Sequence, residues 1–265
     1  MMRFPSFQPR RDLSRLLTAA RNELGAVAAL AVLAGGALAF LDLSEDVAEG
    51  DTAAFDLAIL KALRLPGDPN SLIGPEWLHV AAADITAMGS VTVLGLIVAL
   101  AVGLMLCLKR WSEALVVLIG AGGGVAISQG LKQLFGRERP DLVYRAVEAA
   151  NPSFPSGHAM LSAVVFLTLG ALAARFAPKK RVKALALGAA VVISLLVGAS
   201  RIYLGVHWTS DVLAGWSLGA AWAMACWVAA WAWERRGGKR SPQFPFIPTK
   251  VGTQAEFQNE NDSSR

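Results

Sequence analysis

The sequence is short of charge. Only 17% of its 265 residues are Asp, Glu, Lys or Arg, whereas soluble globular domains average about 25%. The charged residues are also segregated, because long uncharged stretches alternate with short charged segments. A membrane-spanning helix needs about 20 mostly apolar residues. The pattern therefore excludes an ordinary soluble domain and predicts a polytopic membrane protein.

Cysteines and clusters of acidic residues are scarce as well. The two cysteines, Cys107 and Cys226, both fall in apolar stretches, which excludes a disulfide framework and a Cys/His metal signature. No cluster of carboxylates suggests a metal site, so we expect no cofactor. No internal repeat is evident, which argues against a transporter built from inverted repeats. The excess of basic residues follows the loops and forms no single patch, so we expect no nucleic-acid partner.

The apolar stretches predict an all-α fold of six transmembrane helices in one bundle, since lipid offers the backbone no other hydrogen-bond partner. A basic arm (1–23) precedes the six-span domain (24–233), and a polar tail (234–265) is expected to be disordered. The small residues at 37–39 resemble a signal-peptidase site, but the long polar segment before them favours an uncleaved first span. The predicted spans are about 24–41, 91–108, 114–131, 158–174, 184–199 and 212–233.

The distribution of basic residues predicts the orientation. Most of the 25 Lys and Arg residues lie in the N-terminal arm, at 109–110, at 175–183 and in the tail, and these segments alternate so that they share one side. The positive-inside rule makes that side the cytoplasm. We therefore expect a multi-pass protein of the cell (inner) membrane with both termini in the cytoplasm.

The segment 42–76, on the opposite side, is rich in Asp and Glu. Asp51 or Thr52 is suited to cap a short amphipathic helix that ends at Pro66 and Gly67. We expect this helix to lie in the periplasmic interface of the membrane. The alternative is a lid or an element that guides the substrate.

Two loops on the predicted outer side hold the unusual polar residues. His207 and Asp211 are four residues apart, so they share a helical face if the last span begins near Val206. A carboxylate beside an imidazole fixes its tautomer and leaves the other nitrogen as a base or nucleophile. The alternative, that Asp211 only caps the helix, remains equally open from these residues alone.

Three cations, Lys132, Arg139 and Arg201, are predicted at the same membrane face. Each alone would be expected to reach toward lipid phosphates, but together, beside two histidines, they suit a bound phosphate. Ser156 and Gly157 stand where a helix begins, so free backbone N–H groups and the Ser156 hydroxyl would donate to an anion, with His158 next to it. A plain helix cap is the alternative for this stretch. As a set, these groups suit phosphoryl transfer.

Three motifs resemble those of the type 2 phosphatidic acid phosphatase family. They are K-x6-R-P at 132–140, P-S-G-H at 155–158 and S-R-x5-H-x3-D at 200–211. The stretch TAMGS at 86–90 also resembles one that precedes the second span in bacterial members. The same motifs occur in vanadate-dependent haloperoxidases, but those enzymes are soluble, and the predicted spans argue against that relationship.

The resemblance implies a role for each motif residue. It implies that His207 is a nucleophile that forms a phosphohistidine, that Asp211 orients it and that His158 is the general acid. The phosphate would be bound by Lys132, Arg139, Ser156, Gly157 and Arg201, without a metal. The role of Ser200 stays open, and Arg137, which is outside the motifs, is expected at the rim of the site.

The expected function is that of a membrane lipid-phosphate phosphatase with its active site facing the periplasm. Phosphatidate, phosphatidylglycerol phosphate and undecaprenyl pyrophosphate are all candidate substrates, and the sequence does not choose among them. Two alternatives remain open: a lipid phosphotransferase that uses the same phosphohistidine, and a non-catalytic lipid transporter or binding protein.

Overall fold

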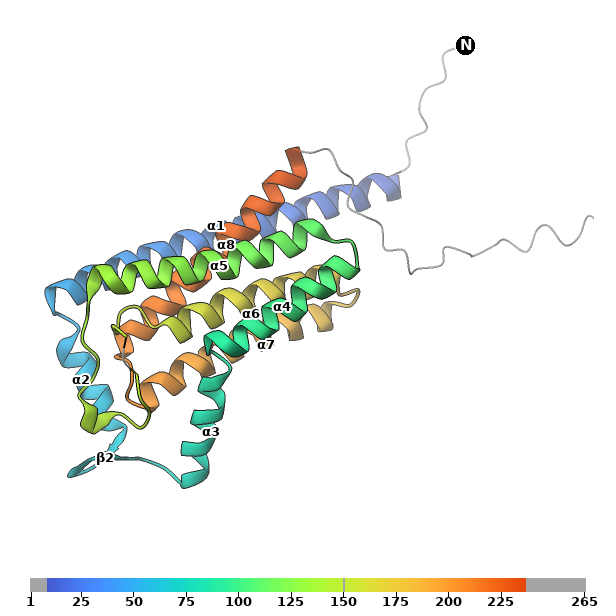
Figure 1. Cartoon of the computed structure of the whole chain (residues 1–265). Coiled ribbons are helices and arrows are strands. Elements are labelled where there is room, and N and C mark those ends of the chain that lie inside the picture. Colours follow the sequence, from blue (N-terminus) through green and yellow to red (C-terminus); the bar gives the residue numbers. More distant parts are fainter. Residues whose placement is uncertain (1–8, 150, 237–265) are drawn as a thin grey trace, which may run out of the picture. The chain divides into compact units, whose positions relative to one another are not determined.

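The structure is a computed structural model that describes residues 9–149 and 151–236. The chain divides into two units, Met1–Ala232 and Trp233–Arg265, and the first contains the fold discussed below. Its elements are α1 (Pro9–Glu49), α2 (Ala53–Ala62), β1 (Arg64–Leu65), β2 (Asp68–Leu72), α3 (Glu76–Ala87), α4 (Val91–Cys107), α5 (Trp111–Phe135), the 3-10 turn η1 (Leu142–Tyr144), α6 (Gly157–Phe176), α7 (Lys180–Tyr203) and α8 (Thr209–Arg236) (Figure 1).

The expected fold class is confirmed, because the described chain is mostly helical and has the helices of a membrane protein. Among the described residues, five helices are long and apolar enough to cross a membrane: the Val27–Glu49 part of α1, and α5, α6, α7 and α8 up to Trp233. A sixth span exists if α3 and α4 are counted as one. Together they are long and apolar enough to cross a membrane, but the axis bends by 51° between them. Six spans therefore stay a prediction, and most of the predicted tail lies outside the described residues.

Serine side chains cap the N-termini of α4 and α6, where the sequence changes from polar to apolar. The hydroxyl oxygen of Ser90 accepts a hydrogen bond from the backbone N–H of Val93 at the start of α4, at 3.2 Å. Ser156 accepts in the same way from Ala159 at the start of α6, at 3.5 Å. Each bond satisfies one of the backbone donors that a helix leaves free at its N-terminus.

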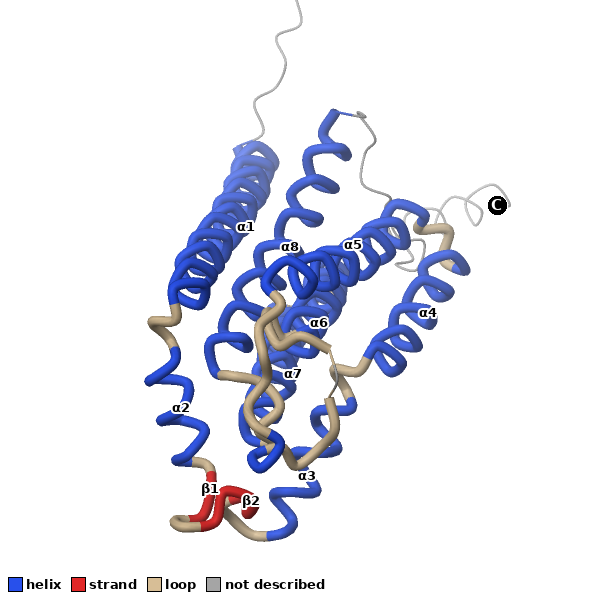
Figure 2. Tube along the Cα trace, turned by 60° about the vertical axis from the view of Figure 1, so that its left-hand side comes forward, coloured by secondary structure: helices blue, strands red, loops and turns tan. Residues whose placement is uncertain are grey.

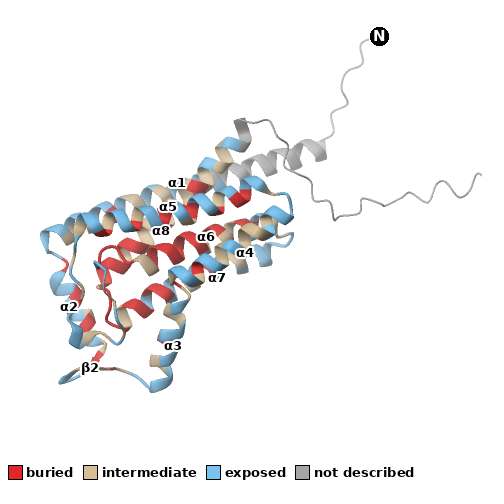
Figure 3. Ribbon diagram, in the orientation of Figure 1, coloured by how far each residue is buried: buried red, intermediate tan, exposed pale blue. Residues whose placement is uncertain are grey.

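Helix α6 forms the centre of the fold. It packs against α5 and α7 and also contacts α4. In the most apolar part of α6, 61% of the residues are buried, whereas in that of α1 only 11% are. Helix α6 therefore contacts protein on most sides, and α1 does not. Figure 3 shows the buried residues gathered along α6 and at the neighbouring ends of α7 and α8.

One end of the helices is covered by α2, the β1–β2 hairpin and α3 (Figure 2). The sequence did not predict this hairpin, because its strands of two and five residues are too short to show a pattern. Arg64 of β1 joins the hairpin to the end of α7 and to the turn η1. Its guanidinium donates to the carbonyl of Tyr203 at 3.1 Å and to the carbonyl of Tyr144, and only 4% of the residue is exposed.

Close packing of α7 on α8 gives a test of this arrangement. A side chain at Gly198 would collide with the Trp216 ring, whereas Gly188, on the same helix, has open space around it. We expect Gly198→Ala to lower the free energy of unfolding by about 1–3 kcal/mol, as overpacking does, and Gly188→Ala to leave it unchanged or raise it, since alanine favours the helix. Thermal unfolding in detergent measures both. Equal effects of the two substitutions would contradict the packing.

Candidate active site

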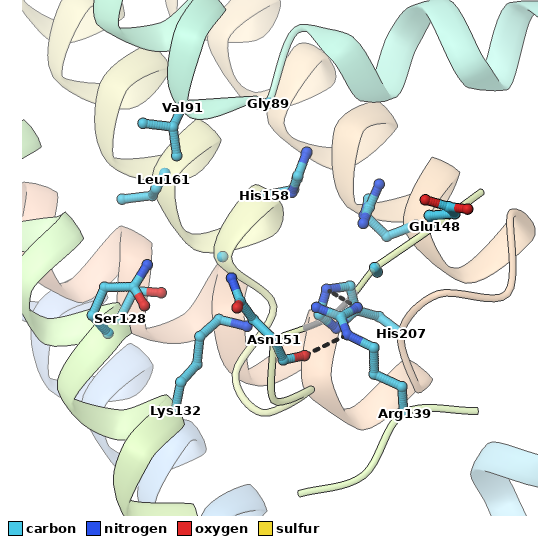
Figure 4. Close-up of a pocket in the computed structure, with 14 residues that line it drawn as sticks. Gly89, Val91, Ser128, Lys132, Arg139, Glu148, Asn151, His158, Leu161 and His207 are labelled. Atoms are coloured by element: carbon cyan, nitrogen blue, oxygen red, sulfur yellow. Dashed lines mark hydrogen bonds between the residues drawn. The ribbon is translucent and has the colours of Figure 1, made fainter. Parts of the chain in front are cut away.

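One pocket at the covered end of the helices gathers six of the predicted site residues. They come from α5, α6, α7 and two loops, and they are Lys132, Arg139, Gly157, His158, Arg201 and His207. Figure 4 shows the Arg139 guanidinium beside the His207 ring, with the Lys132 amine and the His158 ring bordering the same space. Segments far apart in the sequence therefore meet in one cationic site.

His207 and Asp211 form a pair, although the helix begins later than the sequence suggested. Helix α8 starts at Thr209, so His207 lies in the loop before it, not on its first turn. The Asp211 side chain turns back, and its Oδ2 accepts from the Trp208 backbone N–H at 2.9 Å and lies 3.3 Å from His207 Nδ1. Asp211 thus caps α8 and also contacts His207, so it has both of the roles that the sequence left open.

The contacts of His207 define its tautomer. Arg139 Nη1 lies 3.1 Å from Nε2, and since a guanidinium only donates, Nε2 must accept. The ring proton is then on Nδ1, from which it points to Asp211. Ser153 adds its hydroxyl, which donates to Asp211 Oδ2 and lies 3.4 Å from His207 Nδ1. An unprotonated Nε2 therefore faces the pocket.

The surroundings of His207 also keep its ring neutral. The residue is 1% exposed, and burial is the main reason why the pKa of His207 is well below its ordinary value of 6.5. The positive charges of Arg139, Arg201 and Lys132 lower this pKa further. A neutral imidazole keeps the lone pair that a nucleophile needs.

The three cations are held at the pocket by oxygens of the protein. Arg139 donates from Nε to the carbonyl of Asn151 at 2.6 Å, and Lys132 donates to the carbonyl of Pro152. Arg201 donates to the Thr86 hydroxyl at 3.0 Å. Its Nε is buried and has no hydrogen-bond partner among the described residues, which leaves a donor for a bound anion. None of the three needs a carboxylate at the pocket surface to hold it.

The start of α6 contributes Gly157 and His158 to the pocket wall. Ser156 is different: it is fully buried, does not line the pocket and caps α6 with its hydroxyl oxygen. Its predicted contact with phosphate therefore stays a prediction. Gly89, between α3 and α4, packs closely on α6 and α7, because a Cβ there would stand 3.2 Å from the His158 ring and only 2.4 Å from Val197. The TAMGS stretch thus packs directly on the second histidine.

Two further residues of the motif region lie away from the pocket. Arg137 does not lie at the rim of the pocket. Its side chain is 17% exposed and pairs with Asp211 at 2.6 Å, behind the histidine. Ser200 bonds to the carbonyl of Val197 in its own helix, so the structure gives it no direct contact with the pocket. Ser153 and Glu148 were not predicted, yet the first contacts the His–Asp pair and the second lines the pocket.

The arrangement can bind a doubly charged oxyanion and present a nitrogen nucleophile to it. Three cations and the N-terminus of α6 supply positive charge, and His158 supplies a second titratable ring. In the parts of the chain that the structure describes, no three His, Cys, Asp or Glu side chains are gathered so that they could hold a metal ion.

Known proteins show the same combination of fold and motifs. The PAP2 superfamily model matches residues 90–235. Phosphatidylglycerophosphatase B of Bacillus subtilis is 35% identical over 184 residues, which are 69% of this chain and 86% of that protein. A decaprenylphosphoryl-5-phosphoribose phosphatase of Mycobacterium tuberculosis is 33% identical over 57% of this chain and 80% of its own length. The crystal structure of a transmembrane PAP2-type phosphatidylglycerolphosphate phosphatase from Bacillus subtilis superposes with a TM-score of 0.68 at 30% identity, covering 79% of this chain and 98% of that one. The chain therefore belongs to the PAP2 superfamily, as its three motifs predicted, and is a membrane phosphatase.

Proposed function

We propose that this protein removes a phosphate group from a membrane lipid by passing it first to His207 and then to water. The observation that carries the proposal is the unprotonated Nε2 of His207, which faces a pocket lined by three cations. The ring is held from behind by Asp211. A nucleophile positioned in this way suits in-line attack on phosphorus.

In the first step the Arg139 guanidinium passes from Nε2 to the phosphate and Nε2 attacks phosphorus. The bond from phosphorus to the lipid oxygen breaks, and a protonated His158 gives its proton to that oxygen. The proton on Nδ1 of His207 stays directed at Asp211, which balances the positive charge that the ring gains. In the second step His158 takes a proton from water, whose oxygen attacks phosphorus and releases His207. Lys132, Arg139 and Arg201 neutralise the equatorial oxygens in both steps.

The pocket suits a lipid because it is not polar throughout. Val91 of α4 and Leu161 of α6 line it together with the cations, so an acyl or prenyl chain has apolar surface to follow out between the helices. The names of the two curated relatives above describe one phosphatase of a glycerophospholipid and one of a prenyl lipid. We therefore propose phosphatidate, phosphatidylglycerol phosphate or undecaprenyl pyrophosphate as the substrate.

The proposed site faces the periplasm. The basic segments at 109–110 and 175–183 join the ends of α4 and α5 and of α6 and α7 that are remote from the pocket-lining residues. The positive-inside rule makes the side that holds these basic loops cytoplasmic. A headgroup in the outer leaflet would then reach the cations without crossing the bilayer.

Replacement of the nucleophile tests the proposal. We expect His207→Ala to reduce phosphate release from phosphatidate by at least about 1,000-fold, because the covalent route is lost, while the protein stays folded in detergent. His79→Asn is the matched control, since His79 lies on α3 outside the pocket, and should retain activity. Substantial activity of His207→Ala would contradict the proposed nucleophile. Assays with and without an acceptor lipid would detect a phosphotransferase.

The protonation of His207 gives an independent test that needs no substrate. The chain has three histidines, so NMR spectra of the 15N-histidine-labelled protein are simple, and His79→Asn and His158→Gln assign them. We expect His207 to carry its proton on Nδ1 and to stay neutral as the pH falls through 6.5, because burial and the cations lower its pKa. Arg139→Gln should raise this pKa only in part, since burial is the larger cause. A ring that titrates near 6.5, or that is protonated on Nε2, would contradict the site.

A further inference from the structure

Arg137 lies between two buried carboxylates. Its Nη1 is 2.6 Å from Asp211 Oδ1 and its Nη2 is 2.9 Å from Asp56 Oδ2. Both carboxylates are fully shielded, with 0% of either side chain exposed. Arg137 does not line the pocket, so a phosphate bound there is not its partner. Its charge acts on the two acids instead.

The two oxygens of Asp211 have separate partners. Oδ1 faces Arg137, whereas Oδ2 accepts from Ser153 and the Trp208 backbone and faces His207. The terminal torsion of an aspartate has broad minima, so its own rotamer preference does not fix the carboxylate plane. The Arg137 contact on Oδ1 therefore acts together with the Ser153 and Trp208 contacts on Oδ2 to fix the carboxylate plane, and Oδ2 directs His207.

Asp56 extends the contact to α2. Its Oδ1 accepts from the backbone N–H of Ser210 at 2.9 Å and its Oδ2 accepts from the Ser210 hydroxyl at 2.6 Å. Ser210 stands in the first turn of α8, directly before Asp211, and its hydroxyl oxygen also accepts from Arg137 at 2.7 Å. Asp56 thus holds both Arg137 and the start of the helix that carries Asp211, although it is 154 residues away in the chain.

The charge balance around Arg137 depends on its two buried carboxylate partners, Asp56 and Asp211. A buried carboxylate is costly unless it is paired and hydrogen-bonded. One arginine beside two carboxylates leaves a net negative charge, and this charge can stabilise the imidazolium that forms when His207 is phosphorylated. Without Arg137, both buried carboxylates would lose their charged partner and keep only neutral hydrogen-bond donors.

We propose that Arg137 and Asp56 form a positioning pair, which orients Asp211 toward His207 and makes helix α2 part of the catalytic machinery. The proposal rests on the proposed function only because kcat for phosphate release is one of its two readouts. Neither residue touches the substrate, so their effect should fall on kcat and on the state of the His207 ring, with little effect on KM. A merely structural tie between α2 and α8 would lower stability alone.

The substitutions are Arg137→Met, Arg137→Lys and Asp56→Asn, assayed with dioctanoyl phosphatidate in detergent. Arg64→Met is the matched control, because Arg64 is a buried arginine at the same end of the fold that bonds only to backbone carbonyls in the structure. We expect Arg137→Met to lower kcat about 10- to 100-fold with KM changed less than about threefold, as removal of groups that orient a reactive ligand does. Arg137→Lys should restore part of kcat, since an ammonium keeps the charge but cannot bridge both acids. Arg64→Met should lower the thermal midpoint while kcat stays within about threefold.

The His207 resonances complete the test. In the wild type the ring proton is expected on Nδ1, and in Arg137→Met and Asp56→Asn part of the population should move to Nε2. Unchanged kcat and unchanged His207 resonances in folded variants would overturn the proposal, as would a loss confined to KM. If the wild type hydrolysed no lipid phosphate, the proposed function would fail, while the NMR comparison would still decide whether the pair positions His207. If Arg137→Met did not fold, Arg137→Lys and Asp56→Asn would give the same decision.

Discussion

The contact between Asp211 and His207 is the interaction on which the site depends. It holds a neutral imidazole in one tautomer, with Nδ1 at Asp211 and Nε2 at Arg139. The contact is maintained because both residues are buried. In water, solvent molecules would compete with the ring for the carboxylate. The loop before α8 carries His207, and α2 contacts the first turn of α8 through Asp56.

Burial at this place has a cost, and the network around the pair offsets it. Asp211 accepts from a hydroxyl, a backbone N–H and a guanidinium, so no oxygen of the carboxylate is left without a partner. The cations on the pocket side take carbonyl and hydroxyl oxygens as partners in place of carboxylates. They are therefore held in position while their charge remains available to an anion. A site of this kind gains most from a ligand that carries two negative charges.

Much of the site could be predicted from the sequence, because its main residues stand in short motifs whose spacing has a physical reason. Asp56 could not, since an acid in a segment with many acids gives no sign that it meets Ser210 across the fold. Arg137 was assigned to the rim because it is outside the motifs, and nothing in the sequence shows that it lies between two buried carboxylates. Among the spans, the segment predicted at 91–108 matches α4, but helix α3, which precedes it at an angle of 51°, was not predicted.

The central claim, that His207 carries the phosphoryl group between lipid and water, is tested most directly by stereochemistry at phosphorus. A lipid phosphorothioate made chiral with oxygen isotopes can be hydrolysed by the protein in isotopically labelled water, and the configuration of the released thiophosphate determined. Each in-line displacement inverts phosphorus, so transfer through His207 predicts overall retention. Overall inversion would mean that water attacks the lipid phosphate directly, and it would contradict the account.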